Sequence, residues 1–227
     1  STGDELVSIN KKLRDSEVYD SNRYLLHGLL KKFPVIIKDY GLAKDKRSTI
    51  EKKLKIAKRE CHMLLTTGGV SVGDADFVKD ALEKLGKINF WKISVKPGRP
   101  LAYGSLGKCI FFGLPGNPVS VAVTFSLFVE SAIRKLISQE NEEKLYLFAK
   151  LVGKIKKRKG RKEYKRGILT IKNGKYIVKT TGKQGSNILS SLKDANCFIE
   201  LDENVKEVAD GQAVKTIPLN LQSKEYE

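Results

Sequence analysis

The sequence has little cysteine and no long apolar run, and each absence excludes a class of protein. Its three cysteines, Cys61, Cys109 and Cys197, stand far apart, and none belongs to a C-x-x-C pair. This spacing argues against a disulfide framework or a zinc site and fits a reducing compartment. Apolar residues make up 41% of the chain, but no run approaches the roughly 18 residues of a membrane span. We therefore expect a cytoplasmic protein without a membrane segment.

An initiator methionine and a catalytic histidine motif are absent as well. The chain opens on Ser1-Thr2-Gly3-Asp4-Glu5, which is typical of the inside of a loop, so we expect a fragment whose preceding strand is missing. His27 and His62 are the only histidines, and neither has a catalytic partner within its motif. We interpret both as structural, because the sequence contains no visible Ser/His/Asp or Cys/His arrangement.

Acidic residues are outnumbered, since 43 Lys and Arg against 26 Asp and Glu leave a net charge of +17. The densest basic cluster, Lys154–Lys162, has seven basic residues in nine, without the interleaved aromatic residues of a nucleic-acid surface. We interpret the excess mainly as lysine spread over the surface. The alternatives are a field that attracts an anionic substrate and nucleic-acid binding. We expect neither a nucleic acid nor a membrane as a partner.

The first part of the chain alternates strand-like and helical segments. The strand-like segments are 35–37, 63–65, 88–95 and 110–112, and the helical segments are 20–30, one that opens at 48, 75–85 and 118–137. This alternation predicts a three-layer α/β/α domain with a mostly parallel sheet. We place this domain at residues 1–142, with its first strand missing.

The pattern changes after residue 142. Strand-like segments follow one another at 145–152, 163–171, 176–180, 197–201 and 213–217. Asn173-Gly174 stands between two of them and is a strong hairpin signal. Residues 143–227 are therefore predicted to form a small β-barrel domain, with a sandwich as the alternative.

Three loops rich in glycine and proline follow strand-like segments, at 66–74, 96–100 and 114–120. In an open α/β sheet, the loops at the carboxyl ends of the strands line the ligand crevice. Glycine lets the backbone approach a ligand closely, and proline fixes the shape of a loop. We expect the three loops to form one site for an anionic small molecule.

The first loop combines bare amides with carboxylates. Thr67-Gly68-Gly69 lies between a strand and a helix, where exposed N–H groups and the helix dipole bind oxyanions. Its spacing matches neither the Walker loop nor the dinucleotide fingerprint, so a plain structural turn is the alternative. Asp74 and Asp76 follow and can hold Mg²⁺, although Asp74 can also cap the next helix. Asp4 belongs to a second acidic pair, and Asp20 opens the first helix as a cap or a ligand.

The second loop holds two cations on a rigid backbone. Lys96 and Arg99 flank Pro97-Gly98 and precede Pro100. Two cations held in this way suit an oxyanion with several negative oxygens. Solvated surface charge is the alternative.

The third loop and the second domain add further donors. Asn117 is expected to cap a helix that carries Ser120 in its first turn. In the second domain, Arg161 and Arg166 lie on the strand that enters the barrel, and residues 180–187 form a polar loop. This barrel surface can close over an anion bound by the first domain. Decoration of a hairpin is the alternative.

Taken together, these motifs resemble the molybdopterin molybdenumtransferase family, which includes MoeA, gephyrin and plant relatives. The matching segments lie in order along nearly the whole chain: Thr2–Leu6, Tyr19–Arg23, Gly68–Asp74, Lys96–Leu101, Gly113–Ser120, Tyr164–Gly167, Thr181–Ser186 and Ala195–Cys197. The resemblance implies a Mg²⁺-dependent, cytoplasmic transferase of molybdenum cofactor biosynthesis. Such an enzyme inserts molybdate into adenylylated molybdopterin (molybdopterin-adenylate) and releases AMP.

The resemblance also implies an assembly. Family members are elongated four-domain homodimers, with the molybdopterin adenylyltransferase that precedes them in the pathway as a candidate partner. This chain corresponds to the C-terminal two domains. In the family, parts of the partner subunit complete the cleft. Without the first strand and the first two domains, the fragment alone can be folded and still inactive.

Site residues follow by matched position. The catalytic positions are Asp4, Asp20, Asp74, Lys96 and Arg99, of which Asp4 and Asp74 would hold Mg²⁺. Molybdate would contact Lys96, Arg99, Ser120, Arg166 and Ser186, with Arg161 as the alternative to Arg166. The remaining cofactor-binding positions are Thr67, Gly68, Gly69, Ser71, Pro97, Pro100, Pro115, Gly116 and Asn117. Of these, the Gly68–Ser71 and Pro115–Asn117 loops would hold the pterin and its phosphate. Arg99 stands where Lys is common in the family, so a planar fork replaces a point cation.

Two other interpretations stay open. A molybdopterin adenylyltransferase-like enzyme, or a competence-damage-inducible relative, shares the core of the first domain. The β-rich second region and the 96–100 loop disfavour both. A non-catalytic scaffold or binding role is the alternative from another class, since gephyrin-like relatives also anchor membrane receptors.

Overall fold

The computed structural model describes residues 1–69, 77–139 and 145–219. Within this range the chain divides into two compact units. Unit 1 consists of residues 1–93 and 98–137, and unit 2 consists of residues 94–97 and the chain from 138 onward. None of the described helices has the length and apolarity to cross a membrane.

Unit 1 is built on a four-stranded sheet in the order β3 (Met63–Thr67), β7 (Cys109–Leu114), β6 (Pro100–Leu106) and β4 (Lys87–Lys92). Only β3 and β7 run parallel, and the other two pairings are antiparallel. The prediction of a mostly parallel sheet is therefore wrong for the described strands. Strand β6 is not among the predicted strand-like segments, because it opens on Pro100 and contains Gly104, both of which are poor strand formers. It turns into β7 at Gly107-Lys108, and so tight a connection permits only an antiparallel pair.

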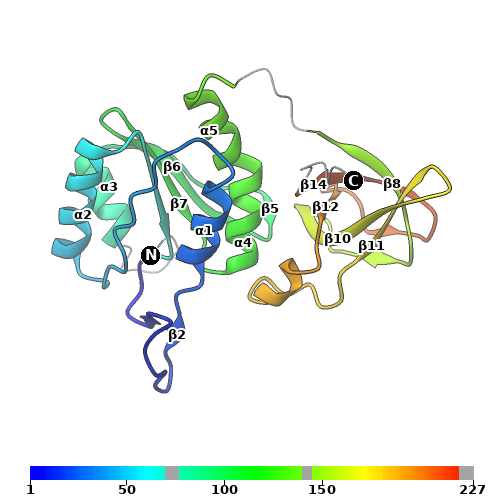
Figure 1. Ribbon diagram of the computed structural model, residues 1–227, viewed down its shortest axis with the longest axis horizontal. Coiled ribbons are helices and arrows are strands. Elements are labelled where there is room, and N and C mark those ends of the chain that lie inside the picture. The colour runs from blue at the N-terminus through cyan, green and yellow to red at the C-terminus, as the bar shows by residue number, and fades with distance from the viewer. Residues whose placement is uncertain (70–76, 140–144, 220–227) are drawn as a thin grey trace, which may run out of the picture. The chain divides into compact units, whose positions relative to one another are not determined.

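Helices cover both faces of this sheet, which confirms the three-layer α/β/α class (Figure 1). On one face lie α2 (Arg47–Glu60) and α3 (Phe77–Leu85). On the other lie α1 (Asn22–Leu30) and one continuous helix made of α4 (Pro118–Thr124), the π-helical turn η1 (Phe125–Val129) and α5 (Glu130–Leu136). Successive strand residues point to opposite faces, so Phe111 packs under α2 and α3 while Phe112 packs under α1 and α4.

The predicted strand at 35–37 is absent. Residues Val35–Ile37 have no strand assignment, and Ile36 is 92% exposed. Apolar composition alone suggested a buried strand, but no described strand pairs with this segment. A short parallel pair, β1 (Leu6–Val7) with β2 (Val18–Tyr19), instead closes the arm formed by residues 8–17.

Unit 2 contains a closed five-stranded barrel, as predicted. The strands β10 (Lys162–Lys172), β11 (Lys175–Thr180), β8 (Leu147–Leu151), β14 (Ala213–Pro218) and β12 (Cys197–Leu201) pair in that order, and β12 returns to β10. The hairpin between β10 and β11 turns at Asn173 and Gly174, both with positive φ (50° and 70°), as a type I′ turn requires.

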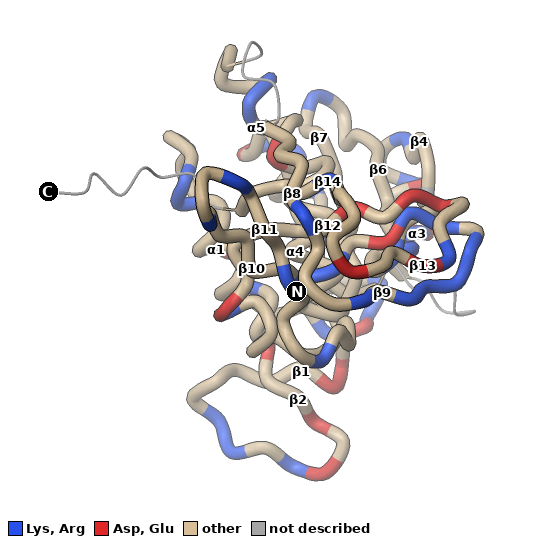
Figure 2. The backbone as a smooth tube through the Cα atoms, turned by 90° about the vertical axis from the view of Figure 1, so that its right-hand side faces the viewer, with Lys and Arg blue, Asp and Glu red and all other residues tan. Residues whose placement is uncertain are grey.

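Smaller elements complete unit 2. β5 (Val95–Lys96) adds to β10 in parallel, β9 (Ile155–Lys156) pairs with β13 (Glu207–Val208), and Leu189–Leu192 form the 3-10 turn η2. The basic run continues from β9 toward β10, and Lys and Arg are scattered over many other parts of the chain (Figure 2).

Candidate functional site

The glycine loops after β3 and β7 come together at the carboxyl ends of these strands. Gly68 has a φ of +77°, and a Cβ placed on it would lie 2.3 Å from the carbonyl oxygen of Thr2. A Cβ on Gly116 would lie 4.0 Å from the Cα of Gly68. The two predicted loops and the N-terminal segment therefore pack backbone against backbone, which only glycine allows at position 68.

The N-terminal segment links this loop to a buried carboxylate. The Thr2 N–H donates to the carbonyl oxygen of Thr67 at 2.8 Å. The Ser1 hydroxyl donates to Oδ1 of Asp20 at 2.8 Å and lies 3.1 Å from the hydroxyl of Thr67. Asp20 is 1% exposed. The structure therefore brings two of the predicted site residues, Asp20 and Thr67, close together through Ser1, which the sequence analysis did not select.

Asp20 is held from the side of α1 as well. The backbone N–H of Arg23 donates to Oδ1 at 3.3 Å, and the Arg23 Nε lies 3.6 Å from Oδ2. Oδ2 has no hydrogen-bond partner among the described residues. A bond from a first-turn backbone N–H to a carboxylate is typical of helix capping, so Asp20 does help to cap α1. One carboxylate oxygen keeps its capacity to accept.

Asn22 joins the site although the sequence analysis did not select it. Its Nδ2 donates to the carbonyl oxygen of Gly116 at 2.6 Å, across 94 positions in the sequence. Its Oδ1 is buried and has no hydrogen-bond partner in the described part of the chain. The sequence signals for Asn22 were its place after Asp20 at the start of a helix and its position within the family-like segment Tyr19–Arg23.

The third loop leads directly into the N-terminus of the long helix formed by α4, η1 and α5. Asn117 is the N-cap residue and Pro118 the first helical residue of α4, as predicted, but the Asn117 side chain makes no capping bond. The first-turn N–H groups carry the positive end of the helix dipole. Ser120 lies in this turn and is 4% exposed.

The second loop reaches α4 through Gly98. A Cβ on Gly98 would lie 2.6 Å from the Cγ2 of Thr124, so this loop backbone rests against α4 in unit 1. Arg99 follows with an exposed side chain, and Pro100 opens β6. Pro97 and Lys96 belong to unit 2, so the loop passes from one unit to the other.

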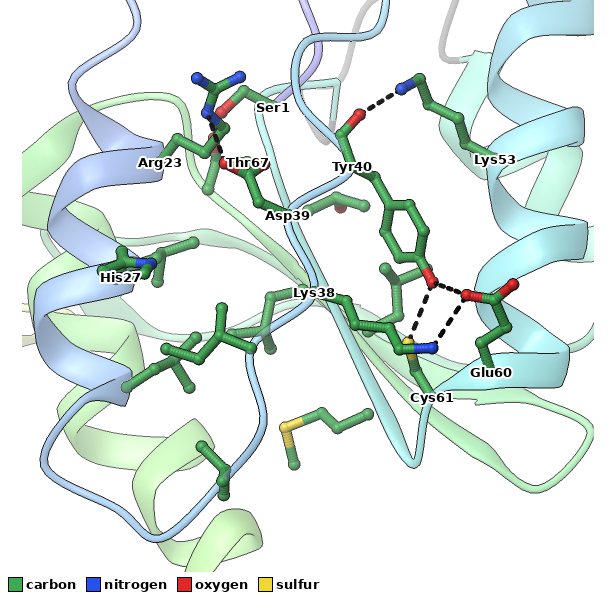
Figure 3. A pocket seen from close by; sticks show the side chains of 18 of the residues that line it. Ser1, Arg23, His27, Lys38, Asp39, Tyr40, Lys53, Glu60, Cys61 and Thr67 are labelled. Atoms are coloured by element: carbon green, nitrogen blue, oxygen red, sulfur yellow. Dashed lines mark hydrogen bonds and ion pairs between the residues drawn. The ribbon is translucent and has the colours of Figure 1, made fainter.

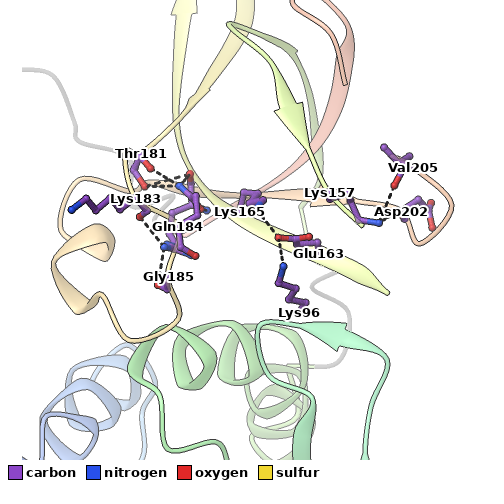
Figure 4. A network of polar contacts seen from close by, with 11 residues as sticks. Lys96, Lys157, Glu163, Lys165, Thr181, Lys183, Gln184, Gly185, Asp202 and Val205 are labelled. Carbon is purple, nitrogen blue, oxygen red and sulfur yellow. Dashed lines mark hydrogen bonds and ion pairs between the residues drawn. The ribbon is translucent and has the colours of Figure 1, made fainter. Parts of the chain in front are cut away.

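In unit 2, Lys96 pairs with a buried carboxylate (Figure 4). Its Nζ lies 3.3 Å from Oε1 of Glu163, and the Nζ of Lys165 lies 2.6 Å from the same oxygen. Burial acts to raise the pKa of Glu163, but Lys165 and Lys96 outweigh it and lower that pKa. The Lys96 side chain is half exposed and keeps donors free, because an ammonium has three.

Arg166 and Arg161, the two arginines predicted to contact the anion, differ in burial and in hydrogen bonding. Arg166 is 1% exposed, and its guanidinium is bonded to the loop that carries Ser186. Arg161 is exposed, with no ion pair or hydrogen bond from its side chain among the described residues. Ser186 is partly exposed.

The acidic residues that the structure describes are not gathered into a metal site. Asp4 is exposed, and its Oδ1 accepts from the backbone N–H of Asp45 at 3.2 Å. Burial, followed by the charges of Asp4 and Glu5, raises the pKa of Asp45. Ser71 and Asp74 lie outside the described residues. Within residues 1–69, 77–139 and 145–219, no three His, Cys, Asp or Glu side chains cluster closely enough to hold a metal ion.

A cavity of about 610 Å³ lies beside β3 in unit 1, between α1 and α2 (Figure 3). Its walls are largely apolar: Leu26, Leu30, Ile50, Leu54, Leu64 and Ile133. At its rim the Tyr40 hydroxyl donates to Glu60 at 3.0 Å, and Arg23 pairs with Asp39 at 3.3 Å. Of the predicted site residues that the structure describes, only Thr67 lines it. The cavity is therefore an apolar neighbour of the glycine loops.

Two family matches cover most of the chain. Residues 1–135 match the family described as a probable molybdopterin binding domain, and residues 149–219 match the MoeA C-terminal region (domain IV). The molybdopterin molybdenumtransferase of Haemophilus influenzae is 42% identical over 222 residues, which cover 97% of this chain and 55% of that protein. The gephyrin of Dictyostelium discoideum is 31% identical, over 97% of this chain and 36% of its own length.

Solved structures agree with this assignment. A molybdopterin biosynthesis MoeA protein from Pyrococcus horikoshii OT3 is 30% identical with a TM-score of 0.76, over 96% of this chain and 51% of that chain. A second Pyrococcus MoeA structure, at 23% identity and a TM-score of 0.80, covers 96% of this chain and 53% of that one and shares its fold. The chain spans about half the length of the curated molybdopterin molybdenumtransferases it matches. The resemblance predicted from the motifs is confirmed, and the chain belongs to the molybdopterin molybdenumtransferase family, of which it carries the probable molybdopterin binding domain and the MoeA C-terminal region.

Proposed function

We propose that this chain is the substrate-binding part of an enzyme that inserts molybdate into adenylylated molybdopterin with release of AMP. The observation that carries the proposal is the convergence of Gly68 and Gly116 at the carboxyl ends of β3 and β7. Bare backbone amides at such a place, next to the N-terminus of α4, bind phosphate and other oxyanions. The names of the relatives identify molybdopterin as the class of ligand.

In this proposal the first unit holds the pterin and its phosphate. Gly68 and Gly69 offer backbone amides, and Pro115, Gly116 and Asn117 form the opposite wall. Asn22 fixes that wall through its bond to the Gly116 carbonyl. Its Oδ1 is buried and has no hydrogen-bond partner among the described residues.

Cations supply the binding of molybdate. Molybdate is a dianion and the adenylate carries further negative charge, so bringing them together requires several positive groups. Lys96, Arg99 and Arg161 have side chains open to solvent and are assigned this role. Ser120 and Ser186 add hydroxyl donors.

The described residues do not by themselves satisfy Mg²⁺. This ion takes oxygen ligands in a near-octahedral arrangement. Asp20 has one buried oxygen without a hydrogen-bond partner among the described residues, although it lies 3.6 Å from the Arg23 Nε. Asp4 is exposed and anchors the backbone at Asp45, and no third ligand is close among the residues described. We therefore assign no step to Mg²⁺. Cytoplasmic location, the homodimer and the adenylyltransferase partner are likewise proposals that the family suggests.

The test is turnover by the full-length enzyme. We would incubate it with molybdopterin-adenylate and molybdate, with and without Mg²⁺, and follow AMP release, with the 227-residue chain in parallel. Lys96→Ala and Arg99→Ala should raise the molybdate concentration needed for half-maximal release, while the control Lys172→Ala on the β10 hairpin should not. Production of pyrophosphate from ATP and molybdopterin would instead identify an adenylyltransferase. Unchanged molybdate dependence in both variants would contradict the proposed role of the second loop.

A further inference from the structure

Arg166 is a buried cation without a carboxylate partner among the residues that the structure describes. Arg166 is 1% exposed, and its guanidinium forms no ion pair within the described part of the chain. Burial lowers the pKa of its guanidinium. Because an unpaired buried charge is costly, the surrounding groups must compensate for it in another way.

Carbonyl oxygens of one loop provide the compensation. Nη2 donates to the carbonyl oxygens of Lys183 and Gly185, both at 3.1 Å, and Nη1 donates to that of Gln184 at 3.2 Å. Nε donates to the hydroxyl of Ser191 at 3.0 Å. Four bonds from one side chain therefore hold both ends of the loop formed by residues 183–191.

Gln184 reinforces the same arrangement from the loop side (Figure 4). Its Oε1 accepts from the backbone N–H of Arg166 at 2.9 Å, and its Nε2 donates to the Arg166 carbonyl oxygen at 3.2 Å and to the hydroxyl of Thr181 at 3.2 Å. The Thr181 N–H also donates to the Arg166 carbonyl oxygen at 3.0 Å. The backbone and the side chain of Arg166 are thus both committed to the loop.

This geometry fixes where the loop presents its donors. Three successive carbonyl groups, of residues 183, 184 and 185, point at the guanidinium. In a trans peptide the N–H of the next residue points the opposite way, so the N–H groups of residues 184, 185 and 186 face away from Arg166. No described residue accepts a hydrogen bond from these three amides. The last of them belongs to Ser186, whose hydroxyl is a further donor.

We propose that Arg166 is a positioning residue, which holds residues 183–186 so that their outward amides and the Ser186 hydroxyl bind a tetrahedral oxyanion, while its own guanidinium does not touch that anion. The identity of the anion as molybdate rests on the proposed function. The ordering of the loop by Arg166 is independent of that function, because it rests on the hydrogen bonds alone. Direct contact by an arginine then belongs to Arg161, which is exposed and directly precedes β10.

The test compares charged and uncharged members of this arrangement. Arg166→Lys keeps the charge but loses the fork, Gln184→Ala removes only neutral bonds, and Arg161→Ala removes an exposed cation. Lys172→Ala is the matched surface control. For each variant we would measure hydrogen exchange of the segment 181–193 and molybdate affinity by calorimetry. Thermal unfolding would verify that the barrel is intact, and Gln184→Ala keeps the test valid if Arg166→Lys does not fold.

We expect Arg166→Lys and Gln184→Ala to speed exchange in 181–193 and to weaken molybdate binding about tenfold, as expected for loss of buried hydrogen bonds. Arg161→Ala should weaken binding without changing exchange. Unchanged exchange in both loop variants, or faster exchange in Gln184→Ala with unaltered molybdate affinity, would overturn the proposal. If the wild-type protein binds no molybdate, the proposed function fails, and the exchange rates still decide whether Arg166 orders the loop.

Discussion

Replacing Gly68 by alanine probes the contact on which the site is built. Gly68 has a φ of +77°, and the new Cβ would lie 2.3 Å from the carbonyl oxygen of Thr2. The left-handed backbone costs about 1–2 kcal/mol for an alanine. Moving Thr2 away also weakens its 2.8 Å bond to Thr67, which is worth about 1 kcal/mol. We expect Gly68→Ala to lower the free energy of unfolding of unit 1 by about 2–3 kcal/mol.

Two glycines in the same unit serve as controls. Gly41 has a similar φ of +70°, but its nearest neighbour is the flexible Arg23 side chain at 3.4 Å, so Gly41→Ala should cost only the backbone strain, about 1–2 kcal/mol. Gly116 has no positive φ and nothing closer than 4.0 Å, so Gly116→Ala should be nearly neutral. Urea unfolding, followed by a probe confined to unit 1, measures all three. An equal loss for Gly68→Ala and Gly41→Ala would refute the close approach of Thr2.

Three further predictions use other contacts. Asn22→Ala should lower the stability of unit 1 by about 1–3 kcal/mol, because it leaves the Gly116 carbonyl unpaired; urea unfolding gives the value, and a neutral result would contradict the contact. Glu163→Gln should destabilise unit 2 above pH 4.5, the ordinary pKa of this group; because the folded-state pKa is lowered, the difference from wild type should disappear as the pH falls through the folded-state pKa, and a difference that persists in acid would count against the Lys165 pairing. Cys197, whose pKa burial raises to about 12, should resist alkylation in the folded protein while the partly exposed Cys61 reacts; mass spectrometry of the labelled peptides decides this.

Much of the fold could be predicted from the sequence, because the patterns that specify strands, turns and helix starts are local. The strand-like segments between 145 and 217 all correspond to barrel strands, and Asn173-Gly174 specified its hairpin by conformational preference alone. Asn117 and Pro118 marked the start of α4 in the same way. These features need no knowledge of distant residues.

Features that depend on distant partners were missed. Val35–Ile37 has a strand-like composition, but no described strand pairs with it. Strand β6 carries the poor strand signals Pro100 and Gly104 and exists because β4 and β7 flank it. A strand in a sheet is stabilised by its neighbours, and these cannot be read from the segment itself.

The candidate site shows the same division. Glycine loops at strand ends could be predicted, because close approach of two backbones requires glycine and the glycines are visible in the sequence. The bond from Asn22 to Gly116 spans 94 positions, and no local pattern in the sequence indicates it. Likewise, nothing in the motif around Arg166 distinguishes a buried arginine that holds a loop from an exposed one that awaits an anion.

The most direct test of the account is an amide NMR titration of the ¹⁵N-labelled chain with molybdopterin-adenylate. The account predicts saturable shifts at Gly68, Gly69, Gly116 and Asn117 and in the first turn of α4, where the free N–H groups lie. Saturable shifts confined to the basic segment 154–162, or to the apolar cavity beside β3, would contradict it.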